Sequence, residues 1–380
     1  MLAAGGHQAL IVGGAVRNAL MGEPIADIDM ASDAHPEQVM ELARSAGLRT
    51  IPTGIRHGTV TLLTPDGASY EITTFRRDVE TDGRNATVAY ATDVAEDARR
   101  RDFTMNALYA QGDGTVLDPV GGLPDLRARR LRFIGQACDR IAEDYLRILR
   151  FFRFHAWYGR PGRADPTALA AIRDLAPGLA RLSKERIRAE LRKLLLAPDP
   201  VDALELMQDC GVLARVLPGA RTGLIPDLIA AEQAAGLAPD WLLRLAALGG
   251  NNPRQALKLA NDETAQLDEL RKAGADSLQR TAFLMGADRA RQLAVLRHAQ
   301  GMPLPAGWRG LIDDASRQIF PLQATDLMPE LNGPRLGRAL NAARDHWIES
   351  DFQAGHDSLL DIARAAADAA PERKSIAKDA

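Results

Sequence analysis

The spacing of apolar residues changes about a third of the way along this 380-residue chain. Before about Ile134, short apolar runs are separated by Gly- and Pro-containing breaks, a pattern typical of strands and short helices. After it, apolar residues recur almost throughout with the 3.6-residue period of helices. A chain of this length is also too long for one compact core. We therefore predict an α+β head of about 135 residues, followed by an all-helical remainder.

Breaks in the helical pattern suggest further divisions. Prolines and glycines interrupt it near residues 161, 198–200, 218–226 and 301–307. The predicted domains are a head over 1–135, a helical neck over 136–197, a helical body and tail over 198–365, and a frayed end over 366–380.

Within the head, turn residues separate the expected elements. We predict strands at 9–12, 25–30, 59–64, 69–75 and 116–118. A short helix from Ala15 is expected to end near Gly22, and Asp33 can cap a second helix that has Pro36 in its first turn. Pro65-Asp66-Gly67 has the chemistry of a hairpin turn. The polar segment 77–92 is expected to be a loop. Together these predict a mixed or antiparallel sheet with flanking helices.

Charge is distributed unevenly, although the net charge is only −3. Residues 1–126 carry a balance of −8, and residues 127–163 carry +7, with ten arginines. No lysine precedes Lys184. Arginine is suited to planar, bidentate contacts with phosphates and base edges. The segment therefore indicates an anionic partner, or else a solvated helix face.

Several classes of protein are excluded by composition. No apolar run reaches the ~18 residues that a membrane span needs, and the N-terminus lacks the basic start of a secretory signal. Only Cys138 and Cys210 are present, too few for a disulfide framework or a cysteine zinc site. We expect a soluble, cytoplasmic protein with no membrane contact, and no protein partner can be inferred.

Asp27-Ile28-Asp29 is the first candidate site. On a strand, residues i and i+2 share a face, so the two carboxylates would converge while Ile28 points into the core. Converging carboxylates repel unless a cation lies between them, and an oxygen-only ligand set suits Mg²⁺. The alternative is a solvated pair at a strand edge. Glu71, on the face of the predicted strand 69–75 opposite to Ile72, is a possible third carboxylate or else a glutamate at a strand edge.

Two further segments could hold a polyphosphate. Gly13-Gly14 lies between a predicted strand and helix, where backbone N–H groups can approach a phosphate, and Arg17 follows one turn later. Arg100-Arg101-Asp102, with Asn106, could hold a triphosphate and a ribose hydroxyl. The alternatives are a tight turn for the first segment and local ion pairs at a helix start for the second.

The fourth candidate is the segment 143–153, EDYLRILRFFR. On one helix, Asp144 and Arg147 would be neighbours one turn apart, and Arg150 and Arg153 would continue along the exposed side. The alternative is an amphipathic helix with one salt bridge. His356-Asp357 lacks the accompanying ligands of a metal phosphohydrolase, so we interpret His356 as structural.

Taken in order, these segments resemble the family of class II tRNA nucleotidyltransferases and bacterial poly(A) polymerases. The resemblance covers about residues 10–195. It is carried by GGAVRNALMG, DID, GIRHGTV, YEITTFR, DGRNATV, DARRRDFTMNAL, LDPVGGLPDL, LRFIG, EDYLRILRFFRF and ERIRAEL.

The resemblance implies a catalytic head, a nucleotide-selecting neck and helical regions that hold RNA. It implies that Asp27 and Asp29 are catalytic and bind Mg²⁺. The nucleotide-binding residues that it implies are Gly14, Arg17, Arg101, Asp144, Arg147, Arg150 and Arg153, with Asp144 and Arg147 reading the base. Candidates for contacts with the RNA backbone are Arg181, Lys184, Arg186, Arg188, Arg192 and Lys193, or else these form a solvated basic face.

One residue departs from the family pattern, since Asn18 stands where Asp is usual. A hydrogen bond to Arg17 could survive this change, whereas a salt bridge could not.

The expected reaction is addition of C, C and A to tRNA from CTP and ATP. A poly(A) polymerase, or an enzyme adding only A or only CC, is the alternative; an intact DGRNATV segment, which the family links to A addition, disfavours CC alone. An alternative of another class is a catalytically inert RNA-binding protein, which would be expected to have lost the Asp pair.

Overall fold

The computed structural model describes residues 1–82, 85–272 and 276–368. The chain divides into two compact units. Unit 1 comprises Met1–Ile229 and Pro239–Ala265, and unit 2 comprises Ala230–Ala238 and Gln266–Ala380. Both predicted junctions, at 135/136 and at 197/198, fall within unit 1. Residues 369–380 of the predicted frayed end lie outside the described residues, and residues 366–368 are helical.

The head contains a seven-stranded mixed sheet, in agreement with the predicted fold class. Its strands, in spatial order, are β3 (Arg49–Gly54), β4 (Thr59–Leu63), β5 (Ser69–Thr74), β2 (Asp29–Ser32), β1 (Leu10–Val12), β8 (Tyr109–Ala110) and β9 (Val116–Leu117). Only the pairing of β2 with β5 is parallel among these strands. The predicted hairpin around Pro65 is present as β4 and β5.

Helices and a second hairpin surround this sheet. They are α1 (Gly14–Met21), α2 (Pro36–Ser45), α3 (Val94–Arg99) and α4 (Gly122–Arg127), with β6 (Arg76–Asp82) paired to β7 (Asn85–Tyr90). The expected loop over 77–92 is therefore wrong for the described part of that segment. Its polar composition hid the strands, because a two-stranded ribbon does not need a buried face along its whole length.

The predicted cap of α2 is also wrong. Asp33 lies three residues before the helix and instead accepts a hydrogen bond from the Gln8 N–H at 2.8 Å. His35 is the N-cap, and its N–H donates to Gln38 Oε1 at 2.8 Å. Pro36 occupies the first helical position, as expected, because its fixed φ suits that position.

The two faces of the sheet bury different clusters. Leu10, Val12 and Ala31 belong to one, and Val39 of α2 packs with Ile72 in the other. These clusters position the first residues of β1 and β2 and the turn that follows β1.

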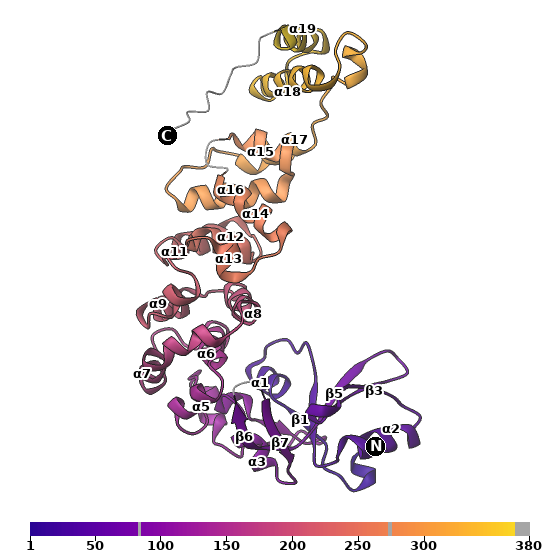
Figure 1. The fold of residues 1–380 in the computed structure, drawn as a ribbon, viewed down its shortest axis with the longest axis vertical. Coiled ribbons are helices and arrows are strands. Elements are labelled where there is room, and N and C mark those ends of the chain that lie inside the picture. Colours follow the sequence, from indigo (N-terminus) through magenta and orange to yellow (C-terminus); the bar gives the residue numbers. More distant parts are fainter. Residues whose placement is uncertain (83–84, 273–275, 369–380) are drawn as a thin grey trace, which may run out of the picture. The chain divides into compact units, whose positions relative to one another are not determined.

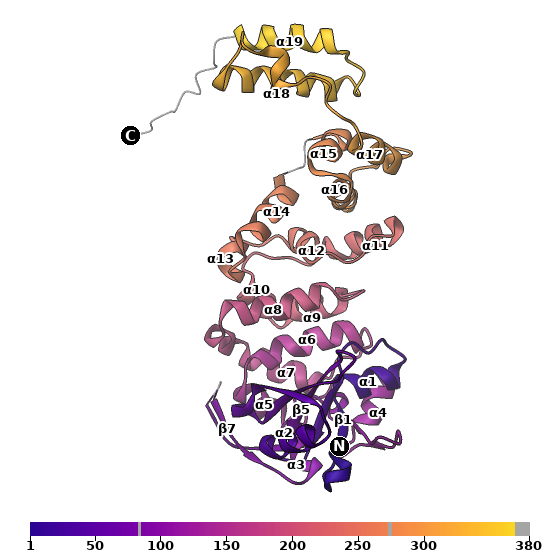
Figure 2. The same ribbon diagram turned by 90° about the vertical axis from the view of Figure 1, so that its right-hand side faces the viewer.

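The remainder of unit 1 is helical, as predicted (Figure 1). It contains α5 (Ala137–Glu143), α6 (Leu146–Tyr158), α7 (Pro166–Leu175), α8 (Lys184–Leu195), α9 (Val201–Asp209), α10 (Val212–Val216), α12 (Trp241–Leu248) and α13 (Pro253–Leu257). The buried face of α6 includes Ile148, Phe151 and Phe152, and α6 packs against α8 and α9 (Figure 2).

Unit 2 is helical and has its own hydrophobic clusters. Its helices are α15 (Leu278–Met285), α16 (Ala287–Ala299), α17 (Trp308–Ser316), α18 (Gly333–Glu349) and α19 (His356–Asp368). Helices α11 (Ile225–Ala235) and α14 (Asn261–Lys272) contribute to both units. One cluster joins Leu327, Trp347 and Leu359, and another joins Ala282 and Ile312. Within the described ranges, no helix has the length and apolar character needed to cross a membrane.

Candidate active site

The two aspartates of the D-x-D segment lie where β2 begins. The predicted strand over 25–30 is wrong at its start, because β2 begins only at Asp29. The register explains the difference: β2 pairs with β1 from Asp29, opposite Val12, and the chain of β1 turns into α1 immediately after Val12. Asp27 and the half-buried Ile28 therefore precede the strand. The exposure of Ile25, at 49%, fits a segment outside the sheet.

The Asp pair forms a site of negative charge. Partial burial raises the pKa of Asp29, Arg101 lowers it, and the charge of Asp27 raises it further, with a net increase. A divalent cation would relieve this repulsion, and two carboxylates with room for water and phosphate oxygens form a suitable ligand set. Glu71 lies in register with Asp29 on β5. Within the described residues, however, no three His, Cys, Asp or Glu side chains form a group that could hold a metal.

The Gly13-Gly14 turn adjoins the Asp pair because Val12 and Asp29 are partners in the sheet. Gly13 has a φ of 72° and a ψ of −120°, a conformation that favours glycine. Its N–H donates to the carbonyl of Leu108 at 3.1 Å. A Cβ at Gly13 would lie 3.5 Å from Arg101 Nη1, so the arginine packs along this turn. Gly14 is the first residue of α1, where the helix dipole favours an anion.

Arg101 is held in place by Asp97 and Tyr109. Its Nη2 donates to Asp97 Oδ2 at 3.0 Å and its Nε donates to the Tyr109 hydroxyl at 3.0 Å. Asp97 is 1% exposed and also accepts from Arg100 Nε at 2.9 Å. Burial alone would raise the pKa of Asp97, but Arg101 and Arg100 outweigh it and lower that pKa. Both arginines therefore form the local ion pairs that the alternative predicted. Arg101 in addition lies beside the glycine turn, and its charge lowers the pKa of Asp29.

Arg17 is buried, and its guanidinium is surrounded by neutral oxygen atoms. Asn18 Oδ1 accepts from Nε at 3.1 Å and from Nη2 at 2.9 Å. Asn106 Oδ1 accepts from Nη1 at 2.5 Å, and the Tyr158 hydroxyl accepts from Nη2 at 2.8 Å. The expected hydrogen bond from Arg17 to Asn18 is therefore present. Burial lowers the pKa of Arg17.

A buried polar chain connects Arg17 with helix α6. Asn106 Nδ2 donates to Asp102 Oδ1 at 3.3 Å, and Asp102 Oδ2 accepts from Arg150 Nε at 2.7 Å. Burial would raise the pKa of Asp102, yet its contacts with Arg150, Asn106 and the Phe103 N–H lower it. Asp102 and Asn106 thus position arginines from two different elements.

Asp144 and Arg147 do not lie on one helix, so that part of the prediction is wrong. Helix α5 ends at Glu143 and α6 begins at Leu146, and Asp144 is extended between them. An Oδ1 hydrogen bond from the Leu146 N–H, at 3.0 Å, fixes the Asp144 carboxylate at the start of α6.

The partners of this pair come from elsewhere. Asp144 Oδ2 accepts from Arg186 Nη2 of α8 at 2.7 Å, whereas Arg147 Nη1 donates to the Glu143 carboxylate and to the Arg140 carbonyl. The single salt bridge proposed as the structural alternative is replaced by these contacts. Both side chains remain half-buried at the junction of α5, α6 and α8.

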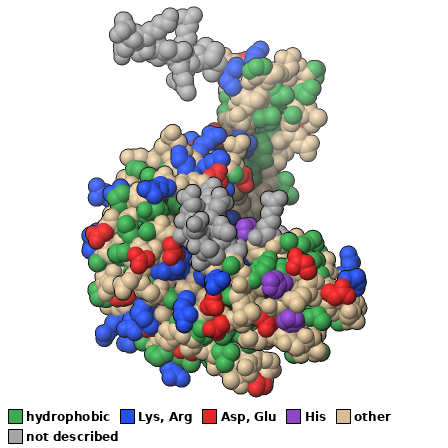
Figure 3. Space-filling view, turned by 60° about the horizontal axis from the view of Figure 1, so that its bottom comes forward, with side chains coloured by type: hydrophobic (Ala, Val, Ile, Leu, Met, Phe, Trp, Pro, Cys, Tyr) green, Lys and Arg blue, Asp and Glu red, His purple; other side chains and the backbone are tan. Residues whose placement is uncertain are grey.

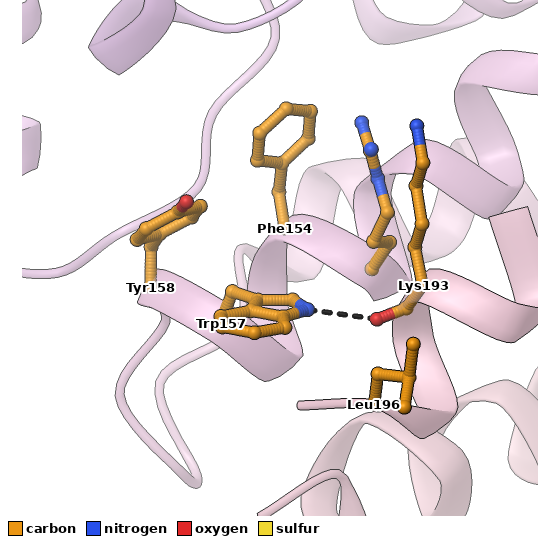
Figure 4. A pocket seen from close by; sticks show the side chains of 6 residues that line it. Phe154, Trp157, Tyr158, Lys193 and Leu196 are labelled. Atoms are coloured by element: carbon orange, nitrogen blue, oxygen red, sulfur yellow. Dashed lines mark hydrogen bonds between the residues drawn. The ribbon is translucent and has the colours of Figure 1, made fainter. Parts of the chain in front are cut away.

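Arg153 lies beside a pocket of about 250 Å³ between α6 and α8. Figure 4 shows the rings of Phe154, Trp157 and Tyr158 facing Lys193 and Leu196, with the Trp157 indole donating to the Lys193 carbonyl at 2.8 Å. Arg153 lies 4.3 Å from the Phe154 ring centroid, and its Nε is 2.9 Å from Glu190 Oε2. Asp27 and Asp29 do not line this pocket.

Several candidate RNA-contacting cations have partners within the chain. Arg186 pairs with Asp144, and Arg188 pairs with Glu263 at 3.1 Å. Arg181 lies over the Tyr145 ring and Arg192 over the Trp241 ring. The face of the head in Figure 3 likewise shows acidic and basic side chains interspersed.

Tyr158 is a site residue that the sequence analysis missed, as are Asp97 and Tyr109, which hold Arg101. The position of Tyr158 four residues after Phe154, on the same helix face, was the available signal. Its contact with Arg17 spans 141 positions, which no local pattern reveals.

Comparisons with known proteins bear on this arrangement. The model of the poly A polymerase head domain matches residues 9–132, and the model of a probable RNA- and SrmB-binding site of polymerase A matches residues 164–224. The chain is 36% identical to the mitochondrial CCA tRNA nucleotidyltransferase 1 of Danio rerio, over 92% of this chain and 85% of the relative. The chain belongs to the CCA tRNA nucleotidyltransferase family.

Other members of the CCA tRNA nucleotidyltransferase family agree with this result. The CCA-adding enzyme of Streptococcus sanguinis is 35% identical over 92% of both chains. The crystal structure of the Bacillus stearothermophilus CCA-adding enzyme in complex with CTP superposes with a TM-score of 0.75. It is 31% identical and covers 96% of this chain and 94% of that one. The mixed-sheet head and the helical remainder are therefore the fold of this family.

Proposed function

We propose that this chain is a template-independent nucleotidyltransferase that adds CCA to tRNA 3′ ends from CTP and ATP and releases pyrophosphate. The observation that carries the proposal is the pairing of Val12 with Asp29, which places the carboxylates beside the glycine turn at the start of α1. Family membership supports the choice of tRNA as substrate. Two carboxylates suited to a divalent cation thus lie beside a turn suited to phosphate, which supports the proposal.

The reaction is attack of the RNA 3′-hydroxyl on the α-phosphorus of the nucleotide, with pyrophosphate leaving. Asp27 and Asp29 would hold Mg²⁺, which when bound supplies a stabilising charge for the hydroxyl and the phosphates. Gly14 and Arg17 bind the triphosphate, and Arg101, which packs along the glycine turn, contributes a further positive charge. Arg150 and Arg153 contact the nucleotide from α6. These groups hold the nucleotide in line with the RNA end.

Selection of C and A follows from the Asp144–Arg147 pair. Cytosine and adenine both present an amine donor beside a ring-nitrogen acceptor. Asp144 accepts from the amine, and Arg147 donates to the ring nitrogen. Guanine and uracil present a carbonyl beside a ring N–H, so both contacts would face the wrong partner, at about 1–3 kcal/mol for each unsatisfied group. Arg186 and Glu143, which hold the pair in this structure, orient it for the base.

The division into head, neck, and body with tail, with tRNA held by the helical regions, belongs to this proposal. Recognition of the tRNA acceptor arm would rest on shape and phosphate contacts. A cytoplasmic location is also proposed. It is supported by Cys138 and Cys210, both free thiols in the described structure, which suit a reducing compartment.

Primer extension tests the function directly. A tRNA ending at its discriminator base is incubated with Mg²⁺ and CTP alone, ATP alone, or both, and product length is read on a gel. We expect two added residues with CTP and three with both nucleotides. Long ladders of A on this or an unrelated RNA would contradict CCA addition and favour a poly(A) polymerase.

The inert RNA-binding alternative requires a separate variant. Asp29→Ala should abolish extension while leaving tRNA binding, measured by filter retention, within about twofold of wild type. Wild-type protein that binds tRNA without extending it, in the presence of Mg²⁺ and both nucleotides, would refute catalysis.

A further inference from the structure

Arg17 is a buried cation whose charge has no direct counterpart. The residue is 5% exposed. Among the described residues, no carboxylate forms an ion pair with it. Its hydrogen-bond acceptors are the side-chain oxygens of Asn18, Asn106 and Tyr158, all of them neutral. Asp102 acts on it only across Asn106.

Buried charges are normally paired, because desolvation of a lone charge is costly. Here the hydrogen-bonding capacity of the guanidinium is largely satisfied, but its positive charge is not neutralised. The nearby Arg150 adds to the positive potential and opposes the charge of Asp102. The N-terminal end of α1, which contains Arg17, contributes its dipole with the same sign. The surroundings therefore favour an added anion.

The hydrogen bonds of Arg17 to the described residues also show which of its N–H donors is free to bind that anion. An arginine has five N–H donors, one on Nε and two on each Nη. Four are used: Nε and one Nη2 donor by Asn18, the second Nη2 donor by Tyr158, and one Nη1 donor by Asn106. Within the described structure, one Nη1 donor is left for a ligand.

Tyr158 fixes the guanidinium from a second element. It is the last residue of α6, and its ring centroid lies 3.8 Å from the Arg17 guanidinium carbon. Ring contact and hydroxyl hydrogen bond together fix both the plane and the rotation of the side chain. Tyr158 also lines the pocket of Figure 4 and lies eleven residues along α6 from Arg147, while Asp144 precedes that helix. That separation corresponds to about 15 Å of helix, so Arg17 lies at the end of α6 opposite to the base-reading pair.

We propose that Asn18 and Tyr158 are positioning residues that hold Arg17 as an uncompensated cation for the terminal phosphates of the incoming nucleotide. After transfer, the same cation holds the pyrophosphate product. This inference rests on the proposed function, because it assigns the phosphate end of that site. It predicts that charge at position 18 tunes affinity for di- and triphosphate groups, without changing recognition of the base or the RNA.

The direct test is Asn18→Asp, which places a carboxylate where the neutral oxygen now accepts two hydrogen bonds. We expect the KM for CTP and the inhibition constant of pyrophosphate both to rise about five- to tenfold, because an arginine already paired with a carboxylate attracts phosphate less. The kcat and the KM for tRNA should stay within about twofold. Inhibition by cytidine 5′-monophosphate, which lacks the terminal phosphates, should not change.

Asn341→Asp is the matched control. Asn341 Oδ1 accepts from Arg344 Nη2 at 2.7 Å on exposed α18, so the same change of charge beside an arginine occurs in unit 2. It should leave all five constants unchanged.

Tyr158→Phe provides an independent variant. It removes the hydroxyl that accepts one of the two Arg17 Nη2 hydrogen bonds, keeps the bond to Asn18, and keeps the aromatic ring. We expect the same two constants to rise about threefold, with inhibition by the monophosphate again unaffected.

Two results would overturn the inference. One is an unchanged KM for CTP and an unchanged pyrophosphate constant in Asn18→Asp. The other is an equal loss for pyrophosphate and for the monophosphate, which a general loosening of the site would produce. Titration calorimetry of Mg²⁺–pyrophosphate with wild type and Asn18→Asp measures the same difference without tRNA. The inference can therefore fail while CCA addition stands, and CCA addition can fail while the phosphate site stands.

Discussion

Asp97 illustrates how a single buried carboxylate organises the site. It accepts hydrogen bonds from Arg100, Arg101 and Tyr109, and its side chain is almost fully buried. Replacing it leaves two arginines without their partner in a region of low dielectric constant. Removal of one member of a buried charge cluster typically costs about 3–5 kcal/mol.

We predict that Asp97→Asn is destabilised by about 3 kcal/mol at pH 7, and that this difference decreases as the pH falls below about 5. The pKa of Asp97 is lower in the folded protein than its ordinary value of 3.8. The stabilising charge is therefore fully present above about pH 5 and is lost as the pH falls through the folded-state pKa. Urea unfolding of both proteins between pH 3 and pH 7 measures this. A difference that stayed constant over the range would contradict the assignment.

The residues that form the site differ in how far the sequence could predict them. The Asp pair, the glycine turn and the arginines are visible as local patterns. Their partners are not, because Asn106 meets Arg17 across 89 positions and Arg186 meets Asp144 across 42. Asp144 had two nearby arginines available and contacts a distant one, since the chain leaves the helix at Glu143.

At the level of elements, the start of α4 lies very close to the backbone of Thr104, and this contact requires a glycine at position 122. Gly122 is the first residue of α4, and a Cβ there would be 2.2 Å from the carbonyl oxygen of Thr104. Thr104 begins the short 3-10 helix Thr104–Asn106, which carries Asn106 to Arg17. A side chain at Gly122 would therefore disturb the segment that positions the arginine.

We predict that Gly122→Ala lowers stability by about 1–3 kcal/mol, the usual cost of overpacking, and reduces nucleotide addition as well. Gly112→Ala is the matched control, because its Cβ would meet nothing within 4 Å. Thermal unfolding and primer extension of both variants decide the matter. Equal behaviour of the two would show that the close approach at Gly122 has no structural importance.

Secondary structure was predictable where it depended on neighbours in sequence. The β4–β5 hairpin follows from Pro65-Asp66-Gly67, and α1 ends at Met21, with the expected Gly22 as its cap. The start of β2 depends on where β1 leaves the sheet, which is a property of a different segment. The β6–β7 ribbon was missed for the same reason, because pairing rather than composition makes it.

At the level of the whole molecule, the two units have separate hydrophobic clusters. In unit 1, two of these clusters lie on the two faces of the sheet and the buried face of α6 packs against α8 and α9. In unit 2, two clusters join α15–α17 and α18–α19. Units that each bury their own core can unfold as separate cooperative transitions.

We predict two calorimetric transitions, which substitutions move one at a time. Asp97→Asn should lower only the transition of unit 1. Leu359→Ala, at a fully buried position of α19, should lower only that of unit 2, by about 2–5 kcal/mol of stability. Coincident movement of both transitions with either variant would show that the chain unfolds as one cooperative body.

The single parallel pairing in the head has a consequence for synthesis on the ribosome. Strand β2 lies between β5, some forty residues later, and β1, whose other neighbour is β8 at Tyr109–Ala110. Strand pairs so distant in sequence form late, because a long loop must close first. Strand β2, at whose start the carboxylates lie, therefore cannot be flanked on both sides until the chain has emerged to the end of β5 at Thr74, and β1 gains its second neighbour only with Tyr109–Ala110. Arg101 and its partner Tyr109 follow β5 in the sequence, so we expect catalysis to begin only when the head is complete.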